Sequence, residues 1–122
     1  MPDLVILGAG SHARVVLDCL RALGRGDEVL GMVEVMGNRA LWGKRLDGCR
    51  VLGGMDVLRR LQARSAVLGY GENVRRAELL AAARRLKLDL PVLIHPDASV
   101  SKRARLGAGT AVLAGAVVVT GS

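Results

Sequence analysis

A glycine-rich segment near the N-terminus has the residue types and the spacing of a phosphate-binding loop. It reads Gly8-Ala9-Gly10-Ser11-His12-Ala13, follows an apolar run and precedes a helical pattern. Gly8 permits a tight turn, Gly10 lets the backbone approach a phosphate, and Ala13 keeps the helix close to the strand. Free N–H groups at the start of that helix would face the anion. The segment therefore predicts a nucleotide-binding loop; a tight turn without a ligand is the alternative.

Two polar side chains near this loop are candidate ligand contacts. His12 would stand at a helix N-terminus, where the helix dipole disfavours the protonated form, so we expect a neutral hydrogen-bonding role. A local capping or packing role is the alternative, and we assign His12 no catalytic role. Glu34 ends the second predicted strand, 24 residues beyond Gly10. An acid at that place accepts hydrogen bonds from a ribose in nucleotide-binding folds, whereas an exposed loop carboxylate is the alternative.

A third group of candidates follows a later apolar strand. Gly71 and Asn73 come just after residues 66–68, and Arg76 stands one helical turn further on. Open α/β sheets bind ligands at the carboxyl ends of their strands, so these residues could contribute to the same site, with Arg76 facing a phosphate or solvent. We interpret His95, beside a proline, as a structural junction residue. The sequence provides no catalytic triad, metal cluster or carboxylate pair.

Apolar periodicity predicts the elements that would hold these residues. Residues 4–7 and 66–68 have the continuous apolar pattern of buried strands, and residues 29–34 form another strand. Helical spacing begins at Ser11, with a core stripe of Ala13, Val16, Leu17, Leu20 and Leu23. A second helix is predicted over about 74–86, with a stripe of Ala77, Leu80, Ala81 and Leu88. This alternation of strand and helix predicts a parallel α/β sheet.

The segments between these elements are less regular. Residues 35–50 are polar and contain glycine, which favours a loop or a small hairpin. Residues 51–52 are a possible minor strand, residues 55–63 a short helix, and residues 91–93 an extended stretch.

The last thirty residues follow a period of six. The aliphatic positions are Ile94, Val100, Leu106, Val112 and Val118, and the small residues four positions later are Ala98, Ala104, Thr110, Ala116 and Ser122. This period fits a three-sided solenoid with six residues per side, an inward aliphatic side chain on each side and 18 residues per coil. The chain then holds one coil and part of a second. Because a solenoid needs about three repeats to bury its core, we expect a fragment of a longer protein, or else a naturally shortened one.

Composition narrows the functional classes. The net charge of +7 comes mostly from arginines spread in pairs along predicted helices, without a block of like charges or an aromatic platform. We interpret them as solvated helix faces, with steering of phosphorylated ligands as the alternative, and expect no nucleic-acid partner. Cys19 and Cys49 stand apart, which is typical of buried free thiols in a reducing compartment. We find no signal peptide and no apolar run long enough for a membrane span, so we expect a cytoplasmic protein.

Three motifs in this order resemble a known family. They are residues 8–13, the segment Gly71-Glu72-Asn73 with Arg76, and the segment Leu93-Ile94-His95-Pro96-Asp97-Ala98-Ser99-Val100-Ser101. They are similar to the sialic acid O-acetyltransferase and nucleotide-sugar N-acetyltransferase family of bacterial surface-glycan synthesis, the NeuD/PglD type. The resemblance covers essentially all 122 residues, and the Ile-His-Pro junction before the hexapeptide repeats is its most specific part.

The resemblance implies both a fold and an activity. It implies a Rossmann-like sugar-nucleotide-binding domain over residues 1–92, followed over residues 93–122 by the first coils of a left-handed parallel β-helix. Gly10, Ser11 and His12 would contact the nucleotide, whereas Glu34 stands where the family commonly has a shorter Asp. Family members form homotrimers, bind acetyl-CoA between subunits and use a histidine of a later coil as general base. This chain contains no such coil, so no catalytic residue is assigned and its own activity stays open.

Two other functional classes remain open from the sequence. An NAD(P)-binding oxidoreductase domain would share the glycine fingerprint, but it would leave the hexad repeat unexplained. A non-catalytic nucleotide-binding module could use the partial solenoid for assembly. The sequence does not specify the sugar, the nucleotide, or acylation at nitrogen or oxygen.

Overall fold

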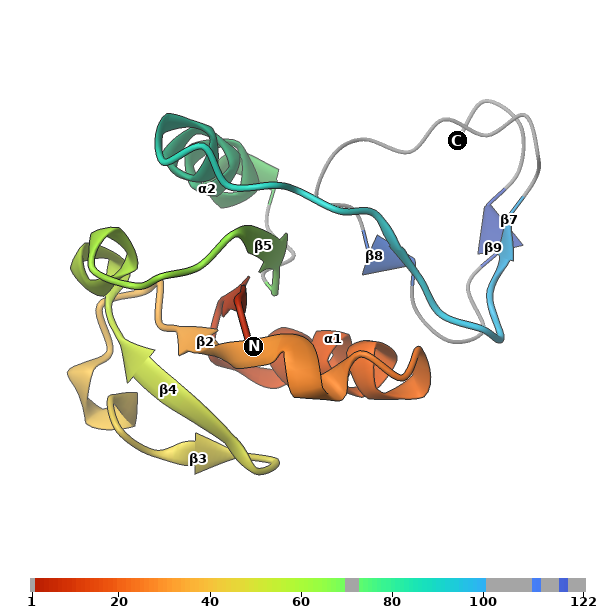
Figure 1. Cartoon of the computed structure of the whole chain (residues 1–122), viewed down its shortest axis with the longest axis horizontal. Helices are drawn as coiled ribbons and strands as arrows, with labels where there is room; N and C mark the ends of the chain where they lie inside the picture. The colour runs from red at the N-terminus through yellow and green to blue at the C-terminus, as the bar shows by residue number, and fades with distance from the viewer. Residues whose placement is uncertain (1, 70–72, 101–110, 113–116, 119–122) are drawn as a thin grey trace.

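The structure is a computed structural model, and it describes residues 2–69, 73–100, 111–112 and 117–118 (Figure 1). In chain order the elements are β1 (Leu4–Leu7), α1 (Ser11–Ala22), η1 (Gly26–Glu28), β2 (Val29–Val33), η2 (Arg39–Leu41), β3 (Arg45–Leu46), β4 (Cys49–Gly53), η3 (Met55–Arg59), β5 (Ser65–Leu68), α2 (Asn73–Arg85), β6 (Leu93–Ile94), β7 (Ser99–Val100), β8 (Ala111–Val112) and β9 (Val117–Val118). The segments labelled η are short 3-10 helices.

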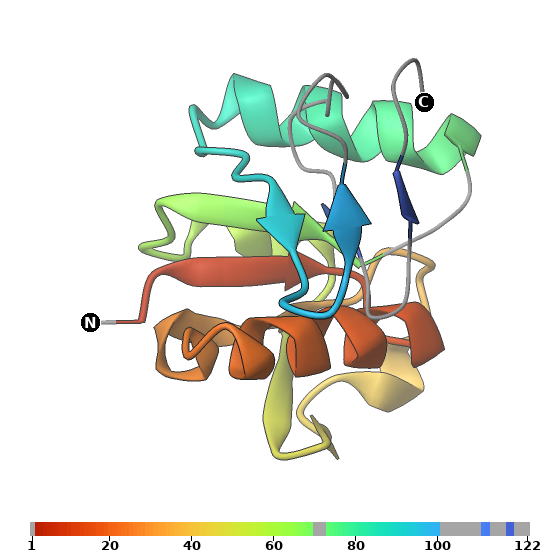
Figure 2. The same ribbon diagram turned by 90° about the vertical axis from the view of Figure 1, so that its right-hand side faces the viewer.

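The N-terminal part is an α/β domain built on a five-stranded sheet. The strand order is β3-β4-β2-β1-β5, in which β4, β2, β1 and β5 are parallel and the edge strand β3 is antiparallel. Helices α1 and α2 cover opposite faces of this sheet (Figure 2). Strand β1 lies between β2 and β5 and is completely buried, as its continuous apolar run predicts. The predicted parallel α/β sheet is therefore confirmed.

The buried face of α1 follows the predicted stripe. Ala13, Val16, Leu17 and Leu20 are buried, together with Cys19, and Leu23 is partly buried. Cys19 and Cys49 lie in the same core cluster as free thiols, as the sequence predicts.

The predicted face of α2 is wrong by one position. Leu79 and Ala83 are the buried residues of this helix, whereas Ala77 and Ala81 are exposed and Leu80 is half-buried. Residues 79–83 read Leu-Leu-Ala-Ala-Ala, so the apolar pattern does not fix which side of the helix faces β5. The predicted contributions of Leu80 and Leu88 are partly right, because both residues are partly buried and pack against the same cluster.

The connecting segments are more ordered than predicted. The hairpin in residues 35–50 is confirmed in part, because β3 pairs with β4 from residue 45 onward. The minor strand at residues 51–52 is part of β4, a full member of the parallel sheet. The predicted helix over residues 55–63 is wrong in its length: η3 ends at Arg59, because the chain must return to the sheet, where Arg64 N–H donates to the carbonyl of Asp3 at 2.7 Å.

The C-terminal segments pair at the spacing that the hexad repeat predicts. Strand β6 pairs in parallel with β8, Ile94 opposite Val112, and β7 pairs in parallel with β9, Val100 opposite Val118. Both pairs join residues 18 positions apart, which is one coil of three six-residue sides. Figure 1 shows these short strands beside the α/β domain, beyond α1 and α2.

The first hexad position is less enclosed than expected. Ile94 is 38% exposed, while its neighbour Leu93 is buried in the α1 side of the α/β core. Successive strand residues face opposite ways, so Leu93 joins the domain core and Ile94 faces away from it. The inward direction predicted for the later hexad side chains, from Val100 onward, lies outside the described residues. The domain boundary at residues 92–93 stays a prediction.

No helix in the described part of the chain is both long enough and apolar enough to cross a membrane.

Candidate functional site

A cavity of about 350 Å³ opens at the carboxyl ends of β1, β2 and β5. It lies where the segments that follow these three strands meet, which is the edge at which open α/β sheets bind ligands. Its lining residues come from the loop after β1, the loop after β2 and the end of β5: Ala9, Gly10, Ser11, His12, Glu34, Val35, Met36, Asn38, Leu41 and Gly69.

The turn after β1 is shaped by two touching glycines. Gly8 has φ +143°, which L side chains rarely adopt, and a Cβ there would lie 2.8 Å from the carbonyl carbon of Gly69. A Cβ at Gly69 would in turn lie 2.6 Å from Cγ2 of Ile6 and 2.9 Å from Cα of Ala13. The two glycines therefore let β1, α1 and β5 approach closely, and Gly8 makes the tight turn that the motif predicts.

The second glycine of the motif is not required by the fold. Gly10 has an extended backbone with φ −145°, which any residue adopts, and no described atom lies within 4 Å of a Cβ built there. It is the N-cap of α1, where among the described side chains none caps the helix. The first N–H groups of α1 thus face the cavity, with the positive end of the helix dipole. Gly10 leaves space that an anion could occupy.

Glu34 organises the loop after β2. It follows the last residue of the strand, and it is buried with 4% exposure. One carboxylate oxygen accepts the N–H of Met36 at 2.7 Å, and the other accepts the N–H of Asn38 at 2.8 Å. The carboxylate therefore holds its own loop in shape while lining the cavity. The alternative of an exposed loop carboxylate is wrong, because both oxygens are engaged and the side chain is buried.

The structure brings only some of the predicted residues together. Ser11, His12 and Glu34 line the cavity with Gly10, and Gly8 shapes the turn beneath it. Gly71 lies outside the described residues. The backbone of Asn73 begins α2. Arg76 lies one turn later and is half-buried, but it is not among the described residues that line the cavity.

Sequence reasoning missed the far wall of the cavity. Met36, Asn38 and Leu41 line it, and Met36 is 61% exposed at its rim. The sequence placed these residues in an unassigned polar loop. Their position directly after a parallel strand is the signal that could have identified them.

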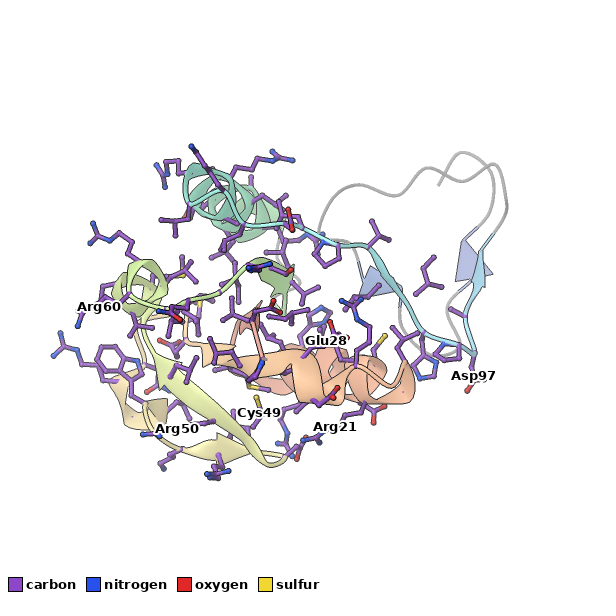
Figure 3. The ribbon with its side chains drawn as sticks, viewed as in Figure 1. Arg21, Glu28, Cys49, Arg50, Arg60 and Asp97 are labelled. Atoms are coloured by element: carbon purple, nitrogen blue, oxygen red, sulfur yellow. The ribbon has the colours of Figure 1, made fainter. Side chains whose placement is uncertain are left out.

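The hairpin next to this wall is tied to α1. The guanidinium of Arg14 donates to both carboxylate oxygens of Asp47, at 2.9 and 2.8 Å, and Arg21 donates to the carbonyl of Asp47. The hydrogen bonds and charge of Arg14 lower the pKa of Asp47. Figure 3 shows Arg21 and Cys49 between α1 and the β3–β4 hairpin.

The other titratable groups in the described part of the chain include two thiols and a junction histidine. Among the described residues, no group of three His, Cys, Asp or Glu side chains could hold a metal ion. Burial raises the pKa of both Cys19 and Cys49, which makes these thiols poor nucleophiles. His95 is buried, and its Nδ1 accepts the N–H of Asp97 at 3.0 Å, which suits a structural residue at the junction.

Comparison with known proteins gives a consistent result. Residues 3–83 match the family described as the PglD N-terminal domain. A mutant of perosamine N-acetyltransferase from Caulobacter crescentus, solved with CoA and GDP-perosamine, is 34% identical over 94% of this chain and 53% of its own, with a TM-score of 0.83. The acetyltransferase domain of PglB from Neisseria gonorrhoeae is 33% identical over 99% of this chain and 58% of its own, with a TM-score of 0.81.

The same PglB domain has been solved in complex with acetyl coenzyme A, at 32% identity and a TM-score of 0.75. A search of curated protein sequences gave no match. The chain spans little more than half the length of the solved relatives, 53% and 58% in the two cases above. The matched residues 3–83 contain the glycine loop, the cavity and all five strands of the sheet. The chain belongs to the PglD N-terminal domain family and corresponds to the N-terminal part of such sugar acetyltransferases.

Proposed function

We propose that this chain is the nucleotide-sugar-binding portion of an acetyl-CoA-dependent sugar N- or O-acetyltransferase of surface-glycan biosynthesis. The observation that carries the proposal is the uncapped N-terminus of α1 facing the cavity at Gly10. Backbone N–H groups and the helix dipole together favour a phosphate there. Gly10 itself has no conformational or packing requirement for glycine, so the space beside it is best explained by a ligand.

The roles of the site residues follow from their positions. Gly10, Ser11 and His12 would bind the diphosphate, with His12 as a hydrogen-bonding partner. Glu34 would support the ribose end, chiefly by holding the loop after β2. Asn73 and Arg76, which belong to α2, would contribute to the same site together with Gly71, which lies outside the described residues.

Acetyl transfer by the complete enzyme belongs to the same proposal. Solved relatives bind CoA or acetyl-CoA, one of them together with GDP-perosamine. Acetyl-CoA is therefore the expected acyl donor, bound by later β-helix coils that would also provide the general base. Trimerisation through that β-helix and a cytoplasmic location belong to the same proposal.

Isothermal titration calorimetry tests this function with the chain as it stands. Nucleoside diphosphates and nucleotide sugars should bind the wild-type chain with measurable heat, and Gly10→Val should abolish the binding while keeping the circular dichroism spectrum. NADH is the discriminating ligand, because an oxidoreductase domain would bind it more tightly than any nucleotide sugar. Absence of binding by every nucleotide sugar, or preferential binding of NADH, would contradict the proposal.

A further inference from the structure

A second cavity, of about 400 Å³, adjoins the first at the carboxyl end of β4. The two share Glu34 and Val35, so they are continuous around the loop that follows β2. The outer walls of the second cavity are Arg39 and Trp42 on one side and residues 54–56 on the other. None of these residues was assigned a role above.

Arg39 and Trp42 form a flat, preorganised wall. The guanidinium carbon of Arg39 lies 5.5 Å from the centre of the Trp42 ring, and Trp42 is 39% exposed. A Cβ at Gly54 would come within 2.8 Å of the indole, so glycine is needed for the ring to lie against the end of β4. Indole rings and guanidinium groups are both surfaces on which nucleobases pack.

Hydrogen bonds connect this wall to the first cavity. The backbone N–H of Asn38 is held by Glu34, and the side-chain oxygen of Asn38 accepts the N–H of Ala40 at 3.2 Å. Asn38 is thus the N-cap of η2, the short helix that begins with Arg39. The loop that lines the first cavity therefore also positions Arg39 and Trp42 in the second cavity.

The sheet order gives a direction for an elongated ligand. Strands β1, β2 and β4 are consecutive neighbours, with Gly10 after β1, Glu34 after β2 and Gly54 after β4. A nucleotide with its phosphates at Gly10 and its ribose near Glu34 would extend its base toward Trp42. On this basis, and resting on the proposed function, we propose that the Arg39–Trp42 cavity is the nucleobase subsite and that Asp56 makes it selective for guanine.

Asp56 selects the base because guanine and uracil present different numbers of N–H donors to a carboxylate. Asp56 lines the cavity, its side chain is exposed, and one of its carboxylate oxygens forms a long ion pair with Arg60 at 3.6 Å. The guanine edge presents two adjacent N–H donors, which a carboxylate can accept together. Uracil presents one N–H between two carbonyl oxygens, which a carboxylate would repel. A guanine nucleotide should therefore bind better than a uracil nucleotide with the same phosphates.

The chain contains a single tryptophan, so its fluorescence reports on this wall alone. GDP should change the Trp42 emission in wild-type protein and should bind about tenfold or more tightly than UDP, as measured in parallel by calorimetry. Asp56→Asn should remove most of the preference for GDP over UDP. Arg39→Ala should lower the affinity for GDP about tenfold. Asp18→Asn, an exposed acid on α1, is the matched control and should leave both affinities unchanged.

The outcomes separate this inference from the function on which it rests. If GDP binds by calorimetry while Trp42 emission is unchanged and Asp56→Asn keeps the wild-type preference, the base lies elsewhere and the subsite is wrong. Equal affinity for GDP and UDP in the wild-type chain would also overturn the guanine assignment. If no nucleotide binds at all, the proposed function itself fails.

Discussion

The Glu34 carboxylate accepts the backbone N–H of Asn38 at 2.8 Å, and this hydrogen bond links the end of β2 to the loop that lines both cavities. The same carboxylate holds Met36 through its other oxygen. An acid directly after β2 therefore has a loop-shaping role in this chain, whether or not it also contacts a ribose.

Glu34→Gln should loosen this loop without unfolding the domain. Glutamine offers one acceptor oxygen in place of two, so a partly buried N–H of Met36 or Asn38 loses its partner, at a cost of about 1 kcal/mol in the free energy of unfolding. Nucleotide affinity should fall as well, because the cavity wall is no longer held. Urea denaturation and calorimetry measure the two effects. Glu28→Gln, which breaks a surface pair with Arg25, is the control and should leave nucleotide affinity unchanged.

The two glycines of the motif should respond differently to the same substitution. Gly8→Ala places a Cβ against Gly69 at a φ of +143°, so it should lower the free energy of unfolding by at least about 2 kcal/mol. Gly10→Ala meets open space in an extended backbone and should leave stability nearly unchanged while weakening nucleotide binding. Thermal unfolding with parallel calorimetry separates the two. Equal destabilisation by both variants would contradict the ligand role of Gly10.

Low pH should weaken the Arg14–Asp47 ion pair, which joins the β3–β4 hairpin to α1. The pKa of Asp47 is lowered in the folded protein by Arg14, so its contribution to stability is complete above the ordinary aspartate pKa near 4 and is lost as the pH falls through the lowered folded value. Asp47→Asn retains a residue suited to the positive φ at this position. Its melting temperature should lie below that of the wild type at neutral pH, and the gap should close as the pH drops below about 4. A gap that stays constant down to pH 2 would contradict this; Asp18→Asn is the charge-matched control.

Cys19 and Cys49 should be slow to react in the native protein. Burial raises the pKa of both thiols and also blocks access, so little thiolate is available at pH 8. Reaction with a disulfide reagent should be at least about tenfold slower in buffer than in guanidinium chloride. Reaction of either thiol at the unfolded rate would show that the α1 side of the core opens readily.

Much of this architecture could be predicted because its signals are local. Each of these signals lies within a short stretch of sequence. They are the apolar run of β1, the buried stripe of α1 and the six-residue period of the C-terminal segment. The face of α2 could not be predicted, since five consecutive apolar residues fit several rotations of the helix. The length of η3 depends on the hydrogen bond from Arg64 to Asp3, which the sequence does not reveal.

The site was predictable in part for the same reason. The glycine loop has a recognisable motif, and Glu34 has a recognisable position after a strand. Met36, Asn38 and Leu41 belong to no motif, and none of them is the first residue after a strand. They line the cavity because of the path that the loop after β2 takes. That path is set by two backbone hydrogen bonds to Glu34, which only the folded chain shows.

The most direct test of the central claim locates the phosphates by NMR. In a ¹⁵N-labelled chain titrated with GDP, the amide resonances of Ser11 and His12 should move most, because their N–H groups would face the diphosphate at the start of α1. Amides of residues 60–64, which line a separate cavity at the opposite end of the strands, should stay in place. Shifts confined to residues 60–64, with Ser11 and His12 unmoved in a chain that binds GDP, would contradict the account.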